Sequence, residues 1–200
     1  MALNELTPTA PVVLASASPR RRTLLNQIGV PCDVHVADID EAALSDEVPA
    51  EYVLRVALAK ARSVRTALAE DPRPVLAADT AVVLGDRILG KPRDREEALR
   101  TLQRLSGKEH KVMTGVALST PAAVFSRLSV SHVWFRDIQP AEMEAYWGTG
   151  EPRDKAGSYA IQGLGGLFVK EIRGSYSGIV GLPLLETADL LGEAEIHLLA

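Results

Sequence analysis

The 200-residue sequence has little of several features, and each shortage excludes a class of protein. It contains one cysteine, Cys32, so no disulfide can form within the chain, and we expect a reducing, cytoplasmic location. No apolar run approaches the roughly 18 residues of a membrane-spanning helix. The opening residues, MALNELTPTA, lack the basic and apolar regions of a signal peptide. We therefore expect no membrane partner.

Positive charge is also scarce. Lysine and arginine number 22 against 26 acidic residues, which gives a formal net charge of −4 at pH 7, and aromatic residues make up only 4% of the chain. General nucleic-acid binders have a basic excess, often interleaved with aromatic side chains, so we expect no nucleic-acid partner. The charge balance still permits a small, locally basic pocket.

Several common catalytic signatures are missing from the sequence. There is no GxxxxGK[ST] phosphate loop, no GxSxG nucleophile elbow and no HExxH zinc motif. The four histidines show no paired ligand spacing, so we do not expect a zinc site. The glycines at 163–166 lack the strand–turn–helix context that a dinucleotide fingerprint requires.

The residues that are present fit a single α/β domain over residues 1–200. Apolar residues make up 46% and charged residues 24%, close to the averages for globular domains. A strand–helix–strand rhythm followed by hairpins predicts a mixed, twisted sheet flanked by helices. The expected elements are, in order, a strand at 11–15, a helix from Ser18 to Gly29, a strand containing Val34 and Val36, a helix at 50–70, a strand at 74–84 with a turn into Ile88-Leu89, a helix from Asp94 to Gly107, strands at 110–118 and 124–136, a short helix containing Met143, Tyr146 and Trp147, a glycine-rich stretch at 148–181 with little helix signal, and a helix from Pro183 through Leu191.

The strongest local feature is the segment LASASPRRR at 14–22. Ser18 suits a helix N-cap and Pro19 the first helical position. A helix start directs free backbone N–H groups and the positive end of its dipole toward an anion. Three arginines in the first turn oppose this dipole, and a phosphate between them would remove the conflict. We favour that interpretation over a solvated basic turn, although only one or two arginines can face one site, since neighbours diverge by about 100°.

Two charged residues fall where apolar residues are expected. Lys60 lies within the apolar stripe of the predicted helix at 50–70, and it either snorkels to solvent or points at an anion in a cleft. Asp79 interrupts the apolar strand at 74–84, where a carboxylate is costly unless it is paired, protonated or bound to metal. Asp79 therefore either belongs to a functional site or caps a turn at a strand end.

Three loops contain polar residues that suit a ligand. Lys91 follows a turn and precedes a helix, and by itself it is explained as a loop lysine. The acidic cluster at 38–41, which ends at Glu41, suits Mg²⁺ or Mn²⁺, although most such clusters are solvated loops. In the segment DKAGSYAIQG at 154–163, glycine permits close backbone approach, and the amide of Gln162 suits the edge of a base.

Together these segments resemble the Maf family of nucleoside triphosphate pyrophosphatases. The form DKAGxYxIQG looks like the branch of the family that acts on dTTP and UTP. Ala17 and Ala160 replace what are often glycines, and we infer no lost activity from such small changes. The resemblance is carried, in order along nearly the whole chain, by LASASPRR (14–21), AADT (77–80), GKPRD (90–94), LSGKEHKVMTGVAL (105–118), DKAGSYAIQG (154–163) and GSYSGIVGLPL (174–184).

The resemblance implies an ITPase-like mixed α/β fold with two lobes around a central cleft, and a homodimer. It implies hydrolysis of dTTP, UTP and modified pyrimidine nucleotides at the α–β phosphoanhydride, with Mg²⁺ or Mn²⁺ as cofactor. It also implies a part in removing non-standard nucleotides and in arresting cell division. The implied site residues are Asp79 as the catalytic acid/base, Asp79 and Glu41 as metal ligands, Ser16, Lys60 and Lys91 at the phosphates, and Arg20, Thr80 and Gln162 at the specificity positions.

Two other functions stay open at this point. A non-catalytic nucleotide-binding regulator of cell division would use the same pocket, but it does not need a carboxylate such as Asp79 in an apolar strand. A nucleic-acid binder that uses the arginines at 20–22 is disfavoured by the acidic balance of the chain.

Overall fold

The computed structural model describes residues 11–199, so the opening MALNELTPTA lies outside the described part of the chain. The strands are β1 (Val12–Leu14), β2 (Cys32–Val34), β3 (Val75–Leu84), β4 (Arg87–Leu89), β5 (Glu109–Ser119), β6 (Val124–Phe135) and β7 (Val169–Arg173). The helices are α1 (Pro19–Gln27), α2 (Pro49–Ala67), α3 (Arg95–Leu105), α4 (Pro140–Gly148), α5 (Tyr176–Val180) and α6 (Leu184–Gly192), with short 3₁₀ helices η1 (Glu151–Asp154), η2 (Ala156–Ser158) and η3 (Leu164–Phe168).

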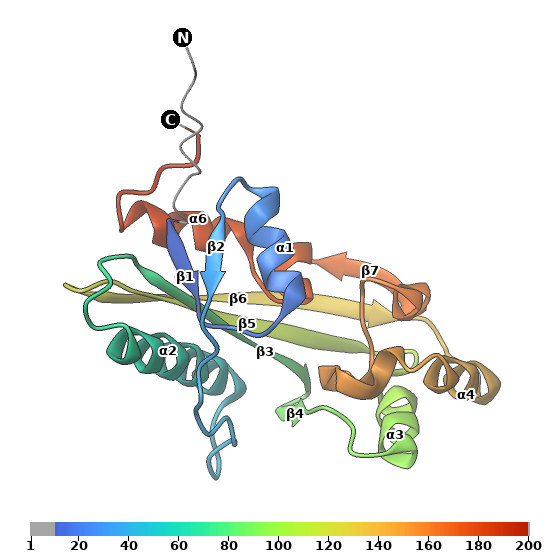
Figure 1. Ribbon diagram of the computed structural model, residues 1–200. Coiled ribbons are helices and arrows are strands. Elements are labelled where there is room, and N and C mark those ends of the chain that lie inside the picture. The colour runs from blue at the N-terminus through green and yellow to red at the C-terminus, as the bar shows by residue number, and fades with distance from the viewer. Residues whose placement is uncertain (1–10, 200) are drawn as a thin grey trace.

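Within residues 11–199, seven strands form one mixed sheet in the order β2-β1-β3-β5-β6-β7, with β4 paired to β3 off this path. The strand β1 is parallel to both β2 and β3, whereas β3, β5, β6 and β7 pair antiparallel. Helix α2 covers one face of the sheet, and α1 and α6 lie on the other (Figure 1). The predicted mixed sheet flanked by helices is therefore confirmed. None of the described helices is long and apolar enough to cross a membrane.

Two separate hydrophobic clusters pack on the side of the sheet opposite α2. One joins Leu25 of α1 and Leu190 of α6 to buried residues of β3 and β5. The other joins Leu102 of α3 and Met143 of α4 to the far ends of the same strands. Each cluster lies at one end of the long strands, so α1 and α6 stand apart from α3 and α4 along the sheet (Figure 1).

The predicted starts of the helices agree with the structure more closely than the predicted short strands do. Ser18 occupies the N-cap of α1, and the Asp94 carboxylate accepts a hydrogen bond from the Glu97 amide at 2.7 Å at the start of α3. The prediction of a strand through Val36 was wrong. The strand β2 ends at Val34, and both valines are exposed, because this three-residue edge strand has little of the sheet to pack against.

The glycine-rich stretch at 148–181 contains more regular structure than its composition indicates. Three 3₁₀ helices, the strand β7 and the short helix α5 lie in it, each three to five residues long. Elements this short carry too little periodicity to be seen in a sequence, and tertiary contacts stabilise them instead.

Gly115 sets how closely α2 approaches the sheet. It lies in β5 directly opposite Asp79, and a Cβ atom there would stand 2.5 Å from the backbone oxygen of Val53 in α2. We expect Gly115→Ala to lower the free energy of unfolding by about 1–3 kcal/mol, because a helix backbone has to move to admit the methyl group. Urea denaturation measures this difference.

The matched control is Gly148→Ala at the end of α4, where an added Cβ would meet nothing within 4 Å. That variant is expected to stay within about 0.5 kcal/mol of the parent protein. Equal stability of the two variants would show that Gly115 does not limit the approach of α2.

Candidate functional site

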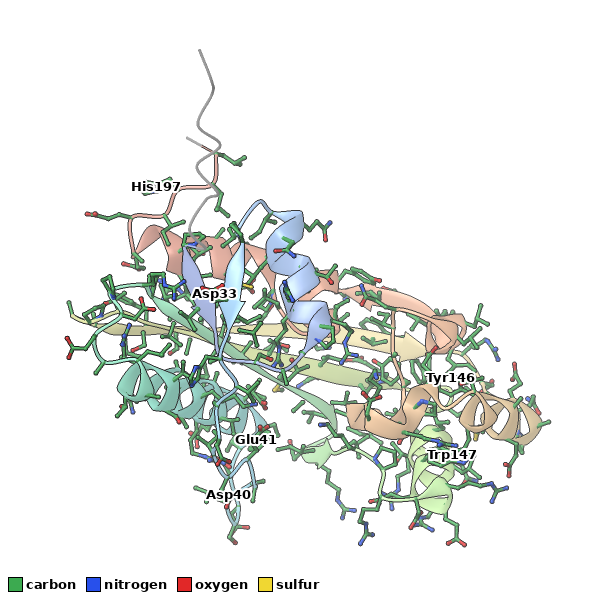
Figure 2. All side chains as sticks on the ribbon, viewed as in Figure 1. Asp33, Asp40, Glu41, Tyr146, Trp147 and His197 are labelled. Atoms are coloured by element: carbon green, nitrogen blue, oxygen red, sulfur yellow. The ribbon has the colours of Figure 1, made fainter. Side chains whose placement is uncertain are left out.

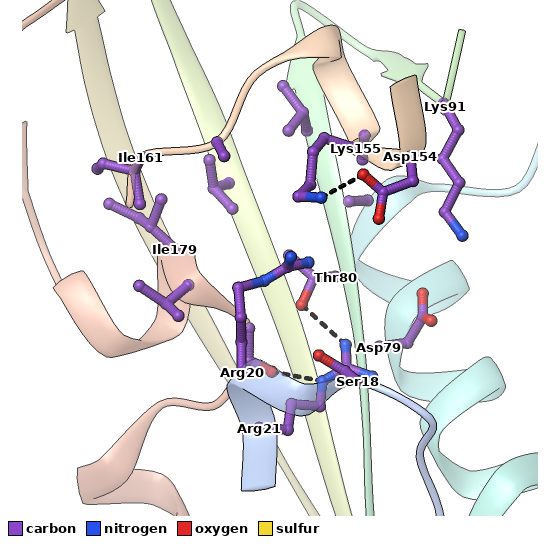
Figure 3. Close-up of a pocket in the computed structure, with 18 of the residues that line it drawn as sticks. Ser18, Arg20, Arg21, Asp79, Thr80, Lys91, Asp154, Lys155, Ile161 and Ile179 are labelled. Atoms are coloured by element: carbon purple, nitrogen blue, oxygen red, sulfur yellow. Dashed lines mark hydrogen bonds and ion pairs between the residues drawn. The ribbon is translucent and has the colours of Figure 1, made fainter. Parts of the chain in front are cut away.

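The edge of β3 is open between two strands, and a pocket lies at this opening. The strand β1 pairs with β3 as far as Leu76, and β4 pairs with β3 from Val82 onward. In the described part of the chain, the residues between these points have no strand partner on that side. Asp79 and Thr80 fall in this gap. The pocket there has a volume of about 680 Å³, within the range of small-molecule sites (Figure 3).

The alternation of side chains along β3 explains how two neighbouring polar residues reach different helices. Ala77 packs with residues of α2, and Ala78 packs with residues of α1. Asp79 shares the direction of Ala77, so it meets Lys60 of α2. Thr80 shares the direction of Ala78, so it meets Arg21 of α1. Both helices thus contribute a cation to one pocket.

Lys60 joins two carboxylates. Its side chain is buried with the apolar stripe of α2, and its ammonium nitrogen lies 2.9 Å from both Asp79 Oδ1 and Glu41 Oε2. The snorkelling alternative is therefore wrong. Asp79 is 6% exposed and lies in the middle of β3, so the alternative in which it caps a turn at a strand end is also wrong.

Burial raises the pKa of Asp79 above its ordinary value, because a carboxylate is poorly solvated in this position. The nearby Glu41 raises it further, whereas the positive charges of Lys60 and Arg21 offset part of the increase. A carboxyl group whose pKa is moved upward is better suited to exchange protons near neutral pH.

Two carboxylates converge at Lys60, and their chemistry fits a hard divalent cation. In residues 11–199, no three His, Cys, Asp or Glu side chains gather closely enough to hold a metal by themselves. Mg²⁺ is commonly held by one or two carboxylates together with phosphate oxygens, and Glu41 and Asp79 are the two carboxylates at Lys60 that match this pattern. Of the acidic cluster at 38–41, Glu41 alone lines the pocket, and Asp40 accepts a hydrogen bond from the Ala42 amide (Figure 2).

The three consecutive arginines of α1 have different surroundings. Arg20 lines the pocket and is partly exposed, whereas Arg22 is exposed and does not line it. Arg21 also lines the pocket and donates three hydrogen bonds. Its acceptors are Gly181 O at 2.8 Å, Ser16 Oγ at 3.1 Å and Thr80 Oγ1 at 3.2 Å. The sequence did not single out Arg21, because a run of three arginines does not show which one faces the sheet.

All the site residues expected from the sequence line this one pocket. The loop residues Lys91 and Gln162 are exposed at its rim, and Figure 3 shows Lys91 and Arg20 approaching from different sides. Asp154 and Lys155, an ion pair in the segment 154–163 that the sequence indicated as ligand-binding, line the pocket as well, although neither was assigned a role. The full set of expected residues that line the pocket is Ser16, Arg20, Glu41, Lys60, Asp79, Thr80, Lys91 and Gln162.

The pocket is more basic than the chain as a whole. Its other wall is apolar and includes Ile161 and Ile179. A cationic end beside an apolar wall can hold a molecule that combines phosphate groups with a flat ring. The charged lining residues are five cations, Arg20, Arg21, Lys60, Lys91 and Lys155, against three acids, Glu41, Asp79 and Asp154.

Known proteins similar to this chain match it over nearly its whole length. A family model described as "Maf-like protein" matches residues 11–194. The dTTP/UTP pyrophosphatase of Alkalilimnicola ehrlichii is 54% identical over 189 residues, which cover 92% of this chain and 93% of the relative. That of Saccharophagus degradans is 51% identical over 190 residues, covering 94% and 90%. Among solved structures, the Ham1 protein of Staphylococcus aureus is 17% identical to this chain and superposes with a TM-score of 0.42. The match covers 64% of this chain and 72% of the Ham1 chain.

Proposed function

This chain belongs to the Maf family, and from that premise we propose that it is a nucleoside triphosphate pyrophosphatase acting on dTTP and UTP. The observation that carries the proposal is the buried pair of Lys60 and Asp79 at the open edge of β3, inside a pocket with a cationic excess. Water is consumed, the bridging P–O bond between the α and β phosphates breaks, and a nucleoside monophosphate and pyrophosphate leave.

The cationic end of the pocket binds the triphosphate in this proposal. Arg20, Lys60 and Lys91 offset its negative charge, and Ser16 adds a hydroxyl group. The first turn of α1 contributes free backbone N–H groups and the positive end of the helix dipole. Because Lys60 and Ser16 are held by hydrogen bonds and ion pairs before substrate arrives, they also stabilise charge that develops during phosphoryl transfer.

The opposite wall of the pocket recognises the base. Gln162 carries both a donor and an acceptor, which match the imide edge that thymine and uracil share. Thr80 and Arg20 are the other two specificity positions that the family resemblance implies, and Ile161 and Ile179 supply an apolar surface for the ring. The same contacts admit modified pyrimidines that keep the imide edge.

Asp79 acts as the general base. Its carboxylate accepts a proton from the attacking water and later releases it to solvent, and Lys60 holds one of its oxygens during this step. Glu41 and Asp79 would hold Mg²⁺ or Mn²⁺. Such an ion would supply Lewis acidity toward water and neutralise phosphate charge.

The setting of the enzyme completes the proposal. We place it in the cytoplasm as a homodimer of single-domain subunits. It removes non-standard nucleotides, takes part in cell-division arrest, and has no nucleic-acid or membrane partner. The single unpaired Cys32 and the net charge of −4 support the location and the lack of nucleic-acid binding, and family resemblance supports the dimer. Analytical ultracentrifugation tests the dimer.

A substrate panel tests the proposed activity. With Mg²⁺ or Mn²⁺ present, we expect pyrophosphate release from dTTP and UTP, with kcat/KM at least about tenfold above that for dCTP, dATP and dGTP. A pocket that hydrogen-bonds one base edge leaves polar groups unpaired when the wrong base enters, which is the reason for this preference. Tight dTTP binding without any pyrophosphate release would contradict the proposal and favour a nucleotide-binding regulator instead.

A further inference from the structure

The segment Ala160–Gly165, which carries Gln162, is held from outside the pocket by one pair of side chains. The pair consists of Tyr146 in α4 and Glu151 in η1, and the Tyr146 hydroxyl donates to Glu151 Oε1 at 2.6 Å. Figure 2 shows Tyr146 at the α4 end of the sheet. Neither side chain is among those that line the pocket, so neither can touch a ligand there.

The pair holds the segment on both sides of Gln162. The amide of Ala160 donates to the Tyr146 hydroxyl oxygen at 3.1 Å. On the other side, the amides of Leu164 and Gly165 each donate to the Glu151 carboxylate at 3.0 Å. Between these points only residues 161–163 are without a bond to the pair. Gln162 is therefore the centre of a short span that is tied down at both ends.

Glycines allow the backbone to come this close to the pair. Gly163 has φ of +139°, which favours glycine, and an added Cβ would collide with the Glu151 carboxylate. At Gly165 an added Cβ would stand 2.6 Å from both the Tyr146 hydroxyl and the Ala160 carbonyl oxygen. Two glycines of the GLGG sequence, Gly163 and Gly165, are thus explained by close approach to the pair, whereas an added Cβ at Gly166 would stand 2.8 Å from the backbone oxygen of Ile161.

The burial of Tyr146 and the protonation states of Tyr146 and Glu151 suit the hydrogen bonds that the pair makes to the segment. The Tyr146 ring is buried and packs edge-to-face on Phe168, with the ring centroids 5.1 Å apart. Burial and the Glu151 carboxylate both raise the pKa of Tyr146, so its hydroxyl keeps its proton and donates. Burial opposes the charged form of Glu151, but hydrogen bonds from Tyr146 and from the Gly165 and Leu164 amides outweigh it and lower the pKa of Glu151. At neutral pH the carboxylate is charged and accepts all three bonds.

We propose that Tyr146 and Glu151 are positioning residues that place Gln162 in the pocket and thereby set the preference for triphosphates with a thymine or uracil base. This inference rests on the proposed function. It predicts that a change in the pair alters which base is accepted, although the pair touches no substrate.

Tyr146→Phe is the most direct test, because it removes one hydroxyl group and leaves the packed ring in place. We expect KM for dTTP to rise about fivefold, kcat to change less than about twofold, and the ratio of kcat/KM for dTTP over dCTP to fall about fivefold, which corresponds to losing one or two hydrogen bonds. The matched control is Tyr176→Phe, at an exposed tyrosine that does not line the pocket, with constants equal to those of the parent.

Glu151→Gln provides a second variant, since an amide cannot accept all three hydrogen bonds as the carboxylate does. We expect the same loss of base preference from it. In a double-variant cycle, adding Tyr146→Phe to Gln162→Ala is expected to cost no further preference, because the pair acts through Gln162.

The two failures are distinguishable. A wild-type protein that releases no pyrophosphate would overturn the proposed function and this inference with it. An active wild type whose Tyr146→Phe and Glu151→Gln variants keep the full dTTP-over-dCTP preference would overturn this inference alone, even if those variants melt at lower temperature.

Discussion

Asp79→Asn is expected to lower kcat for dTTP at least about 10³-fold and to keep the dissociation constant within about threefold of the parent protein. The amide has nearly the shape of the carboxylate but cannot accept a proton from water. Binding is kept because Glu41 remains, both as a partner of Lys60 2.9 Å away and as a carboxylate for the divalent ion, and the other cations of the pocket are untouched. Single-turnover kinetics with dTTP measure the first quantity, and calorimetry with a non-hydrolysable α,β-methylene analogue measures the second.

Asp86→Asn is the matched control for this change. Asp86 lies in the exposed turn between β3 and β4, outside the pocket, and its replacement is expected to leave kcat and binding unaltered. If Asp79→Asn turned over dTTP within tenfold of the parent rate, Asp79 would not be the general base. Loss of nucleotide binding with an intact fold would contradict the claim that the phosphates are held by other residues.

Lys60→Met is expected to lower kcat/KM for dTTP on the order of 10²-fold at pH 7 and to move the acid limb of the pH profile to higher pH. The positive charge of Lys60 offsets part of the increase that burial causes in the pKa of Asp79. Removing that charge raises the pKa of Asp79 further, so Asp79 takes up a proton at a higher pH. Methionine suits the apolar stripe of α2, which keeps the fold.

Protonation of Asp79 on the acid side does not unfold the protein. A carboxyl group whose pKa is higher in the folded state than in the unfolded state stabilises the fold below its unfolded pKa, and this contribution is lost as the pH rises through its folded pKa. The acid limb of kcat/KM therefore reports the proton on Asp79 and not denaturation through this group. Circular dichroism recorded along the same pH series separates the two.

The control for Lys60→Met is Lys170→Met, at an exposed position of β7 that does not line the pocket. Its pH profile is expected to coincide with that of the parent protein. An acid limb at the same pH in Lys60→Met and in the parent would mean that Lys60 does not influence the protonation of Asp79.

The sequence was most informative where a residue conflicted with its local pattern. Lys60 in an apolar stripe and Asp79 in an apolar strand each break a local rule, and they are the two residues that the fold brings to 2.9 Å. The ion pair between them could not be predicted from the sequence, because it depends on which face of β3 packs against α2. That choice follows from the packing of small residues such as Gly115.

Other features have no local signature. Arg21 differs from its two arginine neighbours only through its direction on α1, which the position of β3 determines. Nothing in the local sequence marks Tyr146 in α4 or Glu151 in η1. Their role depends on backbone amides that lie up to 14 positions further along the chain. The prediction for the short strand β2 was wrong for a related reason. The alternation at Val34 and Val36 does not show whether other residues cover that face of the strand, and both valines are exposed.

The most direct test of the central claim is product analysis of dTTP hydrolysis by phosphorus NMR. Purified protein with Mg²⁺ is expected to convert dTTP into dTMP and pyrophosphate in equal amounts, with no dTDP at any time, while Asp79→Asn under the same conditions leaves dTTP intact. Formation of dTDP and inorganic phosphate, or unchanged dTTP with the wild-type protein, would contradict cleavage of the α–β phosphoanhydride in this pocket.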